Sequence, residues 1–229
     1  MIPPTSIDGT DITGATIDGT DVTEITVDGD VVFSAGPTIV DDFETGNLSR
    51  WNTNGHKANI NAWNITTTNV VQGSFALIGN TSNNENIYID RSVSQNTPSF
   101  GNAHQFFVRA SAGNVDNWMG WLSDKNEANF DVPRGHLFAW GDRRFLISTS
   151  TSNDIFVNHS PFANPNTNEW YRVKISYPNN NTLQAEVFEL NGNLFASNSI
   201  SILNQGFGNS VFLHCRDNGI PRFDNWTLL

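Results

Sequence analysis

From residue 40 to the C-terminus, no stretch of this 229-residue chain repeats its apolar residues with the period of a helix. Short runs rich in Val, Ile, Phe, Tyr and Trp alternate instead with clusters of Asn, Gly, Ser and Pro, a pattern typical of strands separated by turns. A dozen such strands without crossover helices predict an all-β protein, an antiparallel β-sandwich. We expect strands at residues 74–78, 86–93, 104–110, 118–122, 136–140, 144–148, 155–158, 170–177, 183–190, 194–200, 211–216 and 222–228.

The clearest local prediction is a three-stranded antiparallel meander over residues 170–200. Tyr171, Val173 and Ile175 alternate with charged and polar residues, so we expect one face of this strand to be buried. A Pro-Asn-Asn-Asn turn then reverses the chain. Between the second and third strands, Asn191-Gly192 predicts a two-residue type I′ turn.

Similar motifs stand at the two ends of this region. Residues 40–51 read Val-Asp-Asp-Phe-Glu-Thr-Gly-Asn-Leu-Ser-Arg-Trp, and residues 222–228 read Arg-Phe-Asp-Asn-Trp-Thr-Leu. Each motif places an aromatic residue beside a carboxylate and has a Trp at or near its end. We therefore expect the first and last strands to lie side by side and to close the sandwich.

Ahead of this region, residues 7–33 contain a repeat with a ten-residue period. Ile-Asp-Gly-Thr-Asp occurs at residues 7–11 and 17–21, and a degenerate copy follows at 27–31. Asp-Gly between β-branched residues predicts hairpins, which are too small to be stable alone. We expect residues 1–36 to form an arm that pairs with its own copies or docks on a partner, the alternative being a flexible tail, and residues 37–229 to form the sandwich. The contact residues that we expect are Ile7, Asp8, Ile17, Asp18, Val27, Asp28 and Phe33.

The composition narrows the choice of partners. A net charge of −11 with only three Lys argues against nucleic acid as a ligand and is compatible with a halophilic source. No apolar run is long enough to span a membrane, so we expect no membrane insertion. The N-terminus has no signal-peptide pattern, so we expect synthesis in the cytoplasm. Cys215 is the single cysteine, so no disulfide can form within the chain.

Residues 38–229 resemble concanavalin A-like (laminin G-like) jelly rolls. The resemblance rests on Asp-Asp-Phe-Glu at 41–44 with Gly46, Leu48 and Trp51, on Trp-Tyr-Arg-Val at 170–173, on Asn191-Gly192 and on Phe-Asp-Asn-Trp at 223–226. It implies a jelly-roll fold, and calcium near strand ends is common in that fold. If the end strands pair, carboxylates suited to a hard cation would converge there. The candidate calcium ligands are Asp41, Asp42, Glu44 and Asp224.

The N-terminal segment has a resemblance of its own. The Ile-Pro-Pro start and residues 17–30 are similar to the N-termini of virion structural proteins of tailed viruses that infect haloarchaea. This implies a non-enzymatic structural protein, such as a capsid decoration, a turret or a tail fibre. Such a protein would be made in the host cytoplasm and displayed on the particle exterior as a homo-oligomer, a trimer or another symmetric ring. Its partners would be other virion proteins and, for host attachment, a surface glycoprotein.

A second functional prediction comes from the aromatic residues in the middle of the chain. Exposed rings beside polar side chains bind sugars on jelly-roll modules. The candidate glycan-binding residues are Trp118, Trp121, Trp140 and Arg143. Trp is also a common core residue, so Trp118, Trp121 and Trp140 have the core as their alternative place, and we assign Trp170 and Trp226 to the core. The alternative function is therefore a carbohydrate-binding or adhesion module of a cell-surface protein.

Catalytic chemistry has the weakest support in the sequence. A glycoside hydrolase needs two carboxylates directed into one cleft, and no Glu-x-Asp-x-Glu run or close variant occurs. Glu186 and Glu189 stand at an odd spacing and fall on opposite strand faces. The five His show no zinc-site spacing. We expect no catalytic residues, and a polysaccharide-cleaving enzyme is the least favoured reading.

Overall fold

The computed structural model describes residues 6–7, 10–11, 15–17, 20–22, 24–27, 30–34, 38–51, 63–79, 87–92, 103–109, 117–122, 135–140, 144–152, 155–202, 210–215 and 220–229. All regular elements in these ranges are strands. The chain divides into two compact units, Met1–Thr38 and Ile39–Leu229, where we had expected the boundary at residues 36 and 37. In the described ranges, no helix is long and apolar enough to cross a membrane.

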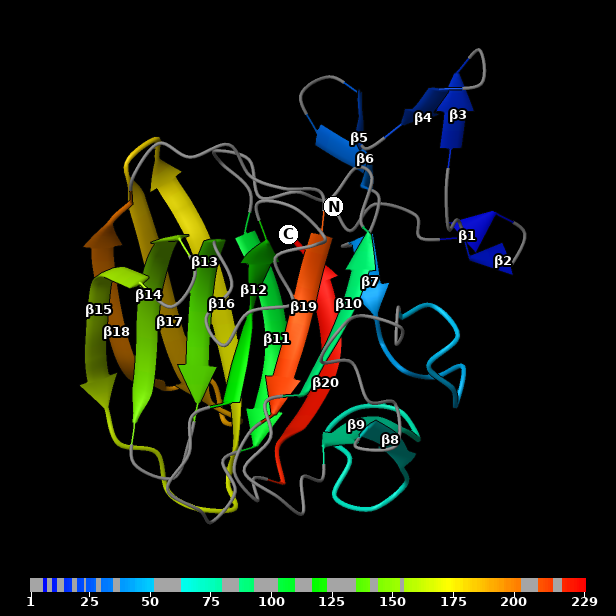
Figure 1. Ribbon diagram of the computed structural model, residues 1–229. Helices are drawn as coiled ribbons and strands as arrows, with labels where there is room; N and C mark the ends of the chain where they lie inside the picture. The colour runs from blue at the N-terminus through cyan, green and yellow to red at the C-terminus, as the bar shows by residue number, and fades with distance from the viewer. Residues whose placement is uncertain are drawn as a thin grey trace. The chain divides into compact units, whose positions relative to one another are not determined.

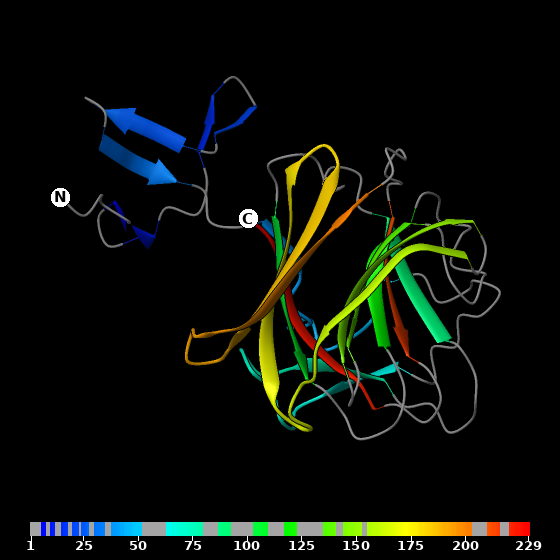
Figure 2. The ribbon, with the colours of Figure 1, turned by 90° about the vertical axis from the view of Figure 1, so that its left-hand side faces the viewer.

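The larger unit is a sandwich of two sheets that face each other (Figures 1 and 2). The six-stranded sheet has the order β10 (Ile87–Ser92), β19 (Ser210–Cys215), β12 (Asn117–Leu122), β13 (Gly135–Trp140), β14 (Phe145–Ser152) and β15 (Ile155–Ala163). The eight-stranded sheet has the order β18 (Leu194–Ser201), β17 (Thr182–Glu189), β16 (Trp170–Asn179), β11 (Ala103–Arg109), β20 (Arg222–Leu228), β9 (Ala76–Gly79) and β8 (Trp63–Thr66), and β7 (Thr38–Asp41) also pairs with β20. The predicted antiparallel β-sandwich is confirmed.

Aromatic side chains from the inner faces of both sheets fill the space between them. Phe106 of β11 lies against Phe138 of β13 with ring centroids 5.8 Å apart, and Phe145 of β14 lies 5.1 Å from Tyr171 of β16. These contacts join the two sheets, and all four rings are buried. Burial of aromatic surface on this scale is the main stabilising contribution to the sandwich.

The predicted meander is confirmed by the antiparallel order β16, β17, β18. Buried and half-buried residues alternate along β16, with Tyr171, Val173 and Ile175 facing the core. The expected two-residue turn at Asn191-Gly192 is wrong. A type I′ turn needs positive φ at both residues, but only Gly192 has it, at 92°. The Gly192 N–H donates to Glu189 O and the Glu189 N–H to Asn193 O, which makes a three-residue loop that ends in a left-handed glycine.

The described residues of the smaller unit form three separate hairpins. β1 (Ser6–Ile7) pairs with β2 (Thr10–Asp11), β3 (Ala15–Ile17) with β4 (Thr20–Val22), and β5 (Glu24–Val27) with β6 (Asp30–Ser34). In each hairpin an Asp-Gly pair connects the strands, as the repeat predicts. Each hairpin is a two-stranded sheet of its own. The side chains of the predicted attachment residues are not among those that the structure describes.

Candidate ligand-binding site

The two chain ends of the sandwich meet, as predicted, through the pairing of β7 with β20. After β7 the chain makes a tight turn, in which Asp41 Oδ1 accepts the Phe43 N–H and Asp41 Oδ2 accepts the Trp51 indole N–H, both at 2.9 Å. Phe43 takes a φ of 61° and is fully buried. Its ring centroid lies 6.2 Å from that of Trp51 and 6.1 Å from that of Phe223. The aromatic residues of the two motifs therefore form one cluster.

A β-bulge in β20 decides which of its side chains point away from the core between the sheets. The pairing of β11 with β20 shifts register between Gln105 and Phe107, and Asn225 has a φ of 42°. Because the bulge adds one residue, Phe223 and Trp226 both face the core although they are three positions apart. Asp224 and Asn225 are consequently presented together on the other side of the sheet.

The backbone of a segment that we call the strap, Asn69–Phe75, is held by the side chains of Asp224, Glu44 and Trp170. Asp224 Oδ2 accepts the N–H groups of Val71 and Gln72, both at 3.2 Å. Glu44 accepts the N–H groups of Ser74 and Phe75 at 2.9 and 3.0 Å. The Trp170 indole N–H donates to Asn69 O at 3.1 Å. The strap carries no regular structure, so these bonds satisfy its backbone donors and position it.

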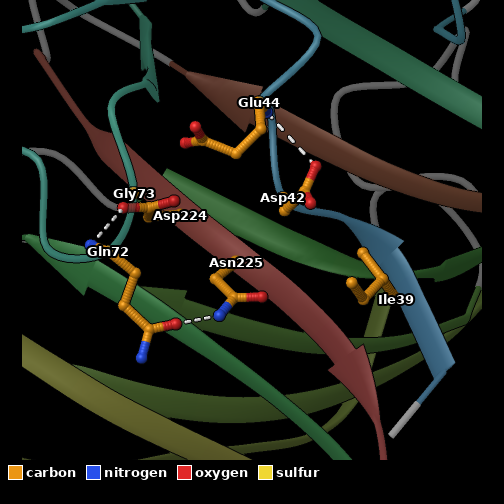
Figure 3. Close-up of a pocket in the computed structure, with 7 residues that line it drawn as sticks. All are labelled: Ile39, Asp42, Glu44, Gln72, Gly73, Asp224 and Asn225. Carbon is orange, nitrogen blue, oxygen red and sulfur yellow. Dashed lines mark hydrogen bonds between the residues drawn. The ribbon is translucent and has the colours of Figure 1, made fainter. Parts of the chain in front are cut away.

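An acidic pocket of about 240 Å³ lies between the strap and the ends of β7 and β20 (Figure 3). Its lining residues are Ile39, Asp42, Glu44, Gln72, Gly73, Asp224 and Asn225. Within it, the Asn225 side-chain amide donates to Gln72 Oε1 and the Glu44 N–H donates to Asp42 Oδ1, as Figure 3 shows.

Asp224 is the unusual group in this pocket. Its side chain is fully buried, and its Oδ1 accepts no hydrogen bond from the described residues. Burial raises the pKa of Asp224 from 3.8 to about 6, and the charge of Glu44 acts in the same direction. Backbone hydrogen bonds from Gln72, Val71 and Asn225 partly oppose that shift. The negative charge at this position is therefore only partly compensated.

The described residues do not bring the four predicted calcium ligands together as one metal site. Asp41 is buried, both of its oxygens accept N–H donors, and it does not line the pocket. The oxygens of Glu44 are occupied by backbone N–H groups of the strap. Over the described ranges, no three His, Cys, Asp or Glu side chains are placed to share a metal ion. The carboxylates of Asp42, Glu44 and Asp224 share one pocket, but they hold backbone segments in place.

The predicted glycan platform is wrong for Trp140. This side chain is fully buried and stacks on Phe138, with ring centroids 6.4 Å apart, so it belongs to the core. Trp118 and Trp121 lie on β12, whose backbone pairs with β13 and β19, but their side chains lie outside the described residues. Arg143 lies outside the described residues altogether.

Trp170 is placed where the sequence analysis did not put it. It is half-buried and lines a second pocket, of about 340 Å³, which we call the Trp170 pocket. The other lining residues are Asn166, Glu169, Tyr171, Glu189, Leu190 and Asn191. The assignment of Trp170 to the core is therefore wrong, whereas that of Trp226, which is fully buried, is confirmed. The sequence could have given the correct prediction, because neighbouring side chains of a strand point to opposite faces. If Tyr171 points into the core, Trp170 must point outward.

The walls of the Trp170 pocket combine an aromatic ring with carboxylates and amides. The Tyr171 hydroxyl accepts the Asn166 N–H at 2.8 Å, and the Asn191 side-chain amide donates to Glu189 Oε2 at 3.1 Å. Burial raises the pKa of Tyr171, and the charges of Glu169 and Glu189 add to that rise. Both carboxylates thus lie close enough to the tyrosine hydroxyl to affect it.

Two buried histidines are structural. His104 Nδ1 accepts the Trp226 indole N–H at 3.0 Å, and His136 Nδ1 lies 3.2 Å from the Tyr177 hydroxyl. Burial lowers the pKa of His104 to about 3 and that of His136 to about 4, so both rings are neutral at pH 7. His136 and Tyr177 are both buried between the two sheets, so a ligand on the surface of the protein would not contact them.

Neither a protein-family model nor a curated protein matches the chain. Solved structures do match it. The globular domain of calreticulin from T. cruzi aligns with a TM-score of 0.53 and 11% identity over 80% of this chain and 85% of that one. The exoplasmic/lumenal domain of VIP36, in its form bound to Ca²⁺ and Man3GlcNAc, aligns at 0.51 and 9% over 75% and 84%. A protein of unknown function from Shewanella oneidensis MR-1 aligns at 0.50 and 10% over 84% and 83%.

At such low identity these likenesses show the fold alone. Together with the antiparallel order of the strands, they confirm the predicted jelly roll. The larger unit of this chain therefore has a jelly-roll β-sandwich fold of the concanavalin A-like type.

Proposed function

We propose that this protein is a carbohydrate-binding module whose site is the Trp170 pocket. The observation that carries the proposal is the arrangement of a half-exposed indole ring beside two carboxylates and two amide-bearing residues in one surface hollow. An aromatic face packs on the C–H groups of a sugar ring, and carboxylates and amides at the rim bond its hydroxyls. The lectin-type fold supports this reading, which is the alternative of the sequence analysis rather than its first choice.

The individual residues have distinct roles in this proposal. Trp170 provides the stacking face, and its indole N–H is held by Asn69 O, which fixes the ring orientation. Glu169 and Glu189 accept hydrogen bonds from sugar hydroxyls, and Asn191 orients Glu189. Leu190, which is 55% exposed, adds an apolar contact at the rim.

The test is binding of the full chain to an immobilised glycan panel, followed by calorimetry on the positive glycans. Trp170→Ala is expected to weaken binding at least about tenfold, because stacking on an aromatic face and its area burial are lost. Phe188→Ala is the matched control, since Phe188 lies on the same sheet under the Arg172 guanidinium, outside the pocket. Unchanged affinity in Trp170→Ala, or an equal loss in both variants, would remove the proposal.

We also propose that the N-terminal arm joins copies of this chain to one another. Its three hairpins are two-stranded sheets with strands of two to five residues, and isolated hairpins of this size are marginally stable in water. Pairing between arms, in a trimer or another symmetric ring, would add further strands to these two-stranded sheets and stabilise them. The oligomer would present several Trp170 pockets at once and raise the avidity for a polymeric glycan.

The virion role stays a prediction that rests on the N-terminal resemblance. It places the protein on a particle exterior, as a capsid decoration, turret or tail fibre that contacts host glycoprotein. Detection of this chain by mass spectrometry in purified particles of its source would support it, and its presence only in cell envelopes would contradict it. Calcium also stays a prediction, tested by whether chelation lowers the thermal midpoint. Product release from a polysaccharide panel would reveal an enzyme instead.

A further inference from the structure

A row of three large side chains crosses the outer face of the eight-stranded sheet. Trp170 of β16 pairs with Arg109 of β11, and Arg109 pairs with Arg222 of β20. Side chains of cross-strand partners point to the same face. Their neighbours Tyr171, Val108 and Phe223 belong to the core, so the row itself faces outward. Strands lie about 4.8 Å apart, so the Cα atoms of Trp170 and Arg222 are separated by roughly 10 Å.

Among the described residues, no carboxylate neutralises the two guanidinium groups of this row. In the described part of the chain, neither Arg109 nor Arg222 forms an ion pair, in contrast to Lys174, whose Nζ lies 3.8 Å from Glu186 Oε2. Arg109 Nε donates to Asn168 O at 2.9 Å. Arg222 Nε is buried, and no acceptor among the described residues reaches it.

The two guanidinium groups also repel each other. Burial lowers the pKa of Arg222, and the positive charge of Arg109 lowers it further, which shows that the two cations are close. Like charges on neighbouring strands destabilise a sheet, so the fold holds this pair against an electrostatic cost. An anion seated between the two groups would offset that cost and satisfy the buried Nε donor.

We propose that Arg109 and Arg222 bind the carboxylate or sulfate group of an acidic saccharide whose ring stacks on Trp170. This inference rests on the proposed function and names its ligand class. The planar fork of a guanidinium matches a carboxylate or sulfate with paired hydrogen bonds, which a lysine ammonium does not. Uronic acids and sulfated sugars are the saccharides that carry such groups.

The order of the strands gives the ligand a direction. Glu189 ends β17, Trp170 begins β16, and the arginines follow on β11 and β20. Uncharged hydroxyls therefore lie toward Glu169 and Glu189, and the anionic substituent lies toward Arg109 and Arg222. The overall charge of −11 does not prevent this, because distant charges are screened beyond about 8 Å at physiological salt.

The experiment compares a uronic-acid oligosaccharide with its carboxyl-reduced, neutral counterpart on the full chain. The acidic oligosaccharide is expected to bind at least about tenfold more tightly at low salt, and the difference is expected to shrink as salt rises. Arg222→Gln and Arg109→Gln are expected to remove that preference, so that each variant binds the acidic and the neutral oligosaccharide equally tightly. Arg172→Gln is the matched control, because Arg172 lies on the same sheet but is engaged by Gln105 Oε1 at 3.0 Å and by the Phe188 ring.

Thermal unfolding separates binding from folding, since Arg222→Gln relieves a like-charge contact and is expected to leave the midpoint unchanged or higher. Equal affinity for the acidic and neutral sugars would overturn the inference and leave the carbohydrate function standing. If neither sugar binds, the proposed function fails. Titration with inorganic sulfate then decides whether the two arginines form an anion site. Shifts of the Arg109 and Arg222 Nε–H resonances would then sustain an anion site without a saccharide, and their absence would overturn it.

Discussion

At the scale of single residues, Gly73 shows how tightly the strap is held. Its φ is +66°, and a Cβ at this position would overlap the carboxylate of Glu44, which is bonded to the backbone of the next two residues. Both the backbone conformation and the close contact therefore require glycine.

We predict that Gly73→Ala lowers the free energy of unfolding by about 2–3 kcal/mol, from left-handed strain and displacement of Glu44 from its backbone partners. Gly192→Ala is the control. Its φ of +92° imposes comparable strain, but nothing lies within 4 Å of its Cβ, so about 1 kcal/mol is expected. Urea unfolding measures both. Equal losses would mean that the Glu44 contacts do not stabilise the fold.

The raised pKa of Asp224 predicts a pH dependence of opposite sign to that of an ordinary surface carboxylate. The pKa of Asp224 is about 6 in the folded protein and 3.8 for an ordinary aspartate, the value taken for the unfolded chain. Between pH 3.8 and pH 6, the folded protein therefore binds more protons at this position than the unfolded chain does. The contribution of this group to stability is therefore fully present below about pH 3.8 and is lost as pH rises through about 6.

Asp224→Asn isolates this effect, because an amide keeps an acceptor for the strap and has no charge. The unfolding free energy of the native protein minus that of the variant should fall by on the order of 2 kcal/mol between pH 4 and pH 7. A difference that rises with pH would contradict the account. It would show that the ionised carboxylate is stabilised, as a bound cation would do.

At the scale of strands, the sequence pattern was sufficient to predict features that depend only on neighbouring residues, such as a meander or a hairpin. The alternation around Tyr171 was sufficient to predict the meander, and the Asp-Gly pairs were sufficient to predict the three hairpins. The bulge in β20 was not predictable, because a single residue in the left-handed conformation leaves no periodic signal, although Asn225 is a residue type that tolerates it. Without the bulge, Asp224 and Asn225 could not be placed on one side of the sheet.

Deletion of residues 1–36 tests the roles of the elements. The sandwich has its own core, so we expect the truncated chain to unfold cooperatively with a thermal midpoint within a few degrees of the full chain. The proposed arm contacts predict a homo-oligomer for the full chain and a monomer for the truncated one, measured by light scattering after gel filtration. An oligomer that survives the deletion would contradict the role of the arm.

For the whole molecule, the paired aromatic and acidic motifs at the chain ends predicted how the sandwich closes. Trp140 as part of the glycan platform and Trp170 as a core residue were wrong predictions, because local sequence crowding does not reveal which ring faces solvent. Trp140 lies in a crowded stretch and is buried, whereas Trp170 opens a strand and lines a pocket. The acidic motif was recognised, but its residue types did not reveal that Asp41, Glu44 and Asp224 accept backbone N–H groups.

The central claim is that Trp170 is the tryptophan that contacts a saccharide. The most direct measurement follows the indole N–H resonances of the seven tryptophans by NMR during titration with a glycan that binds. The account predicts that the Trp170 resonance shifts in proportion to occupancy, while those of the buried Trp140 and Trp226 stay in place. A Trp170 resonance that does not move at saturation, with the shifts centred on Trp118 or Trp121, would contradict it.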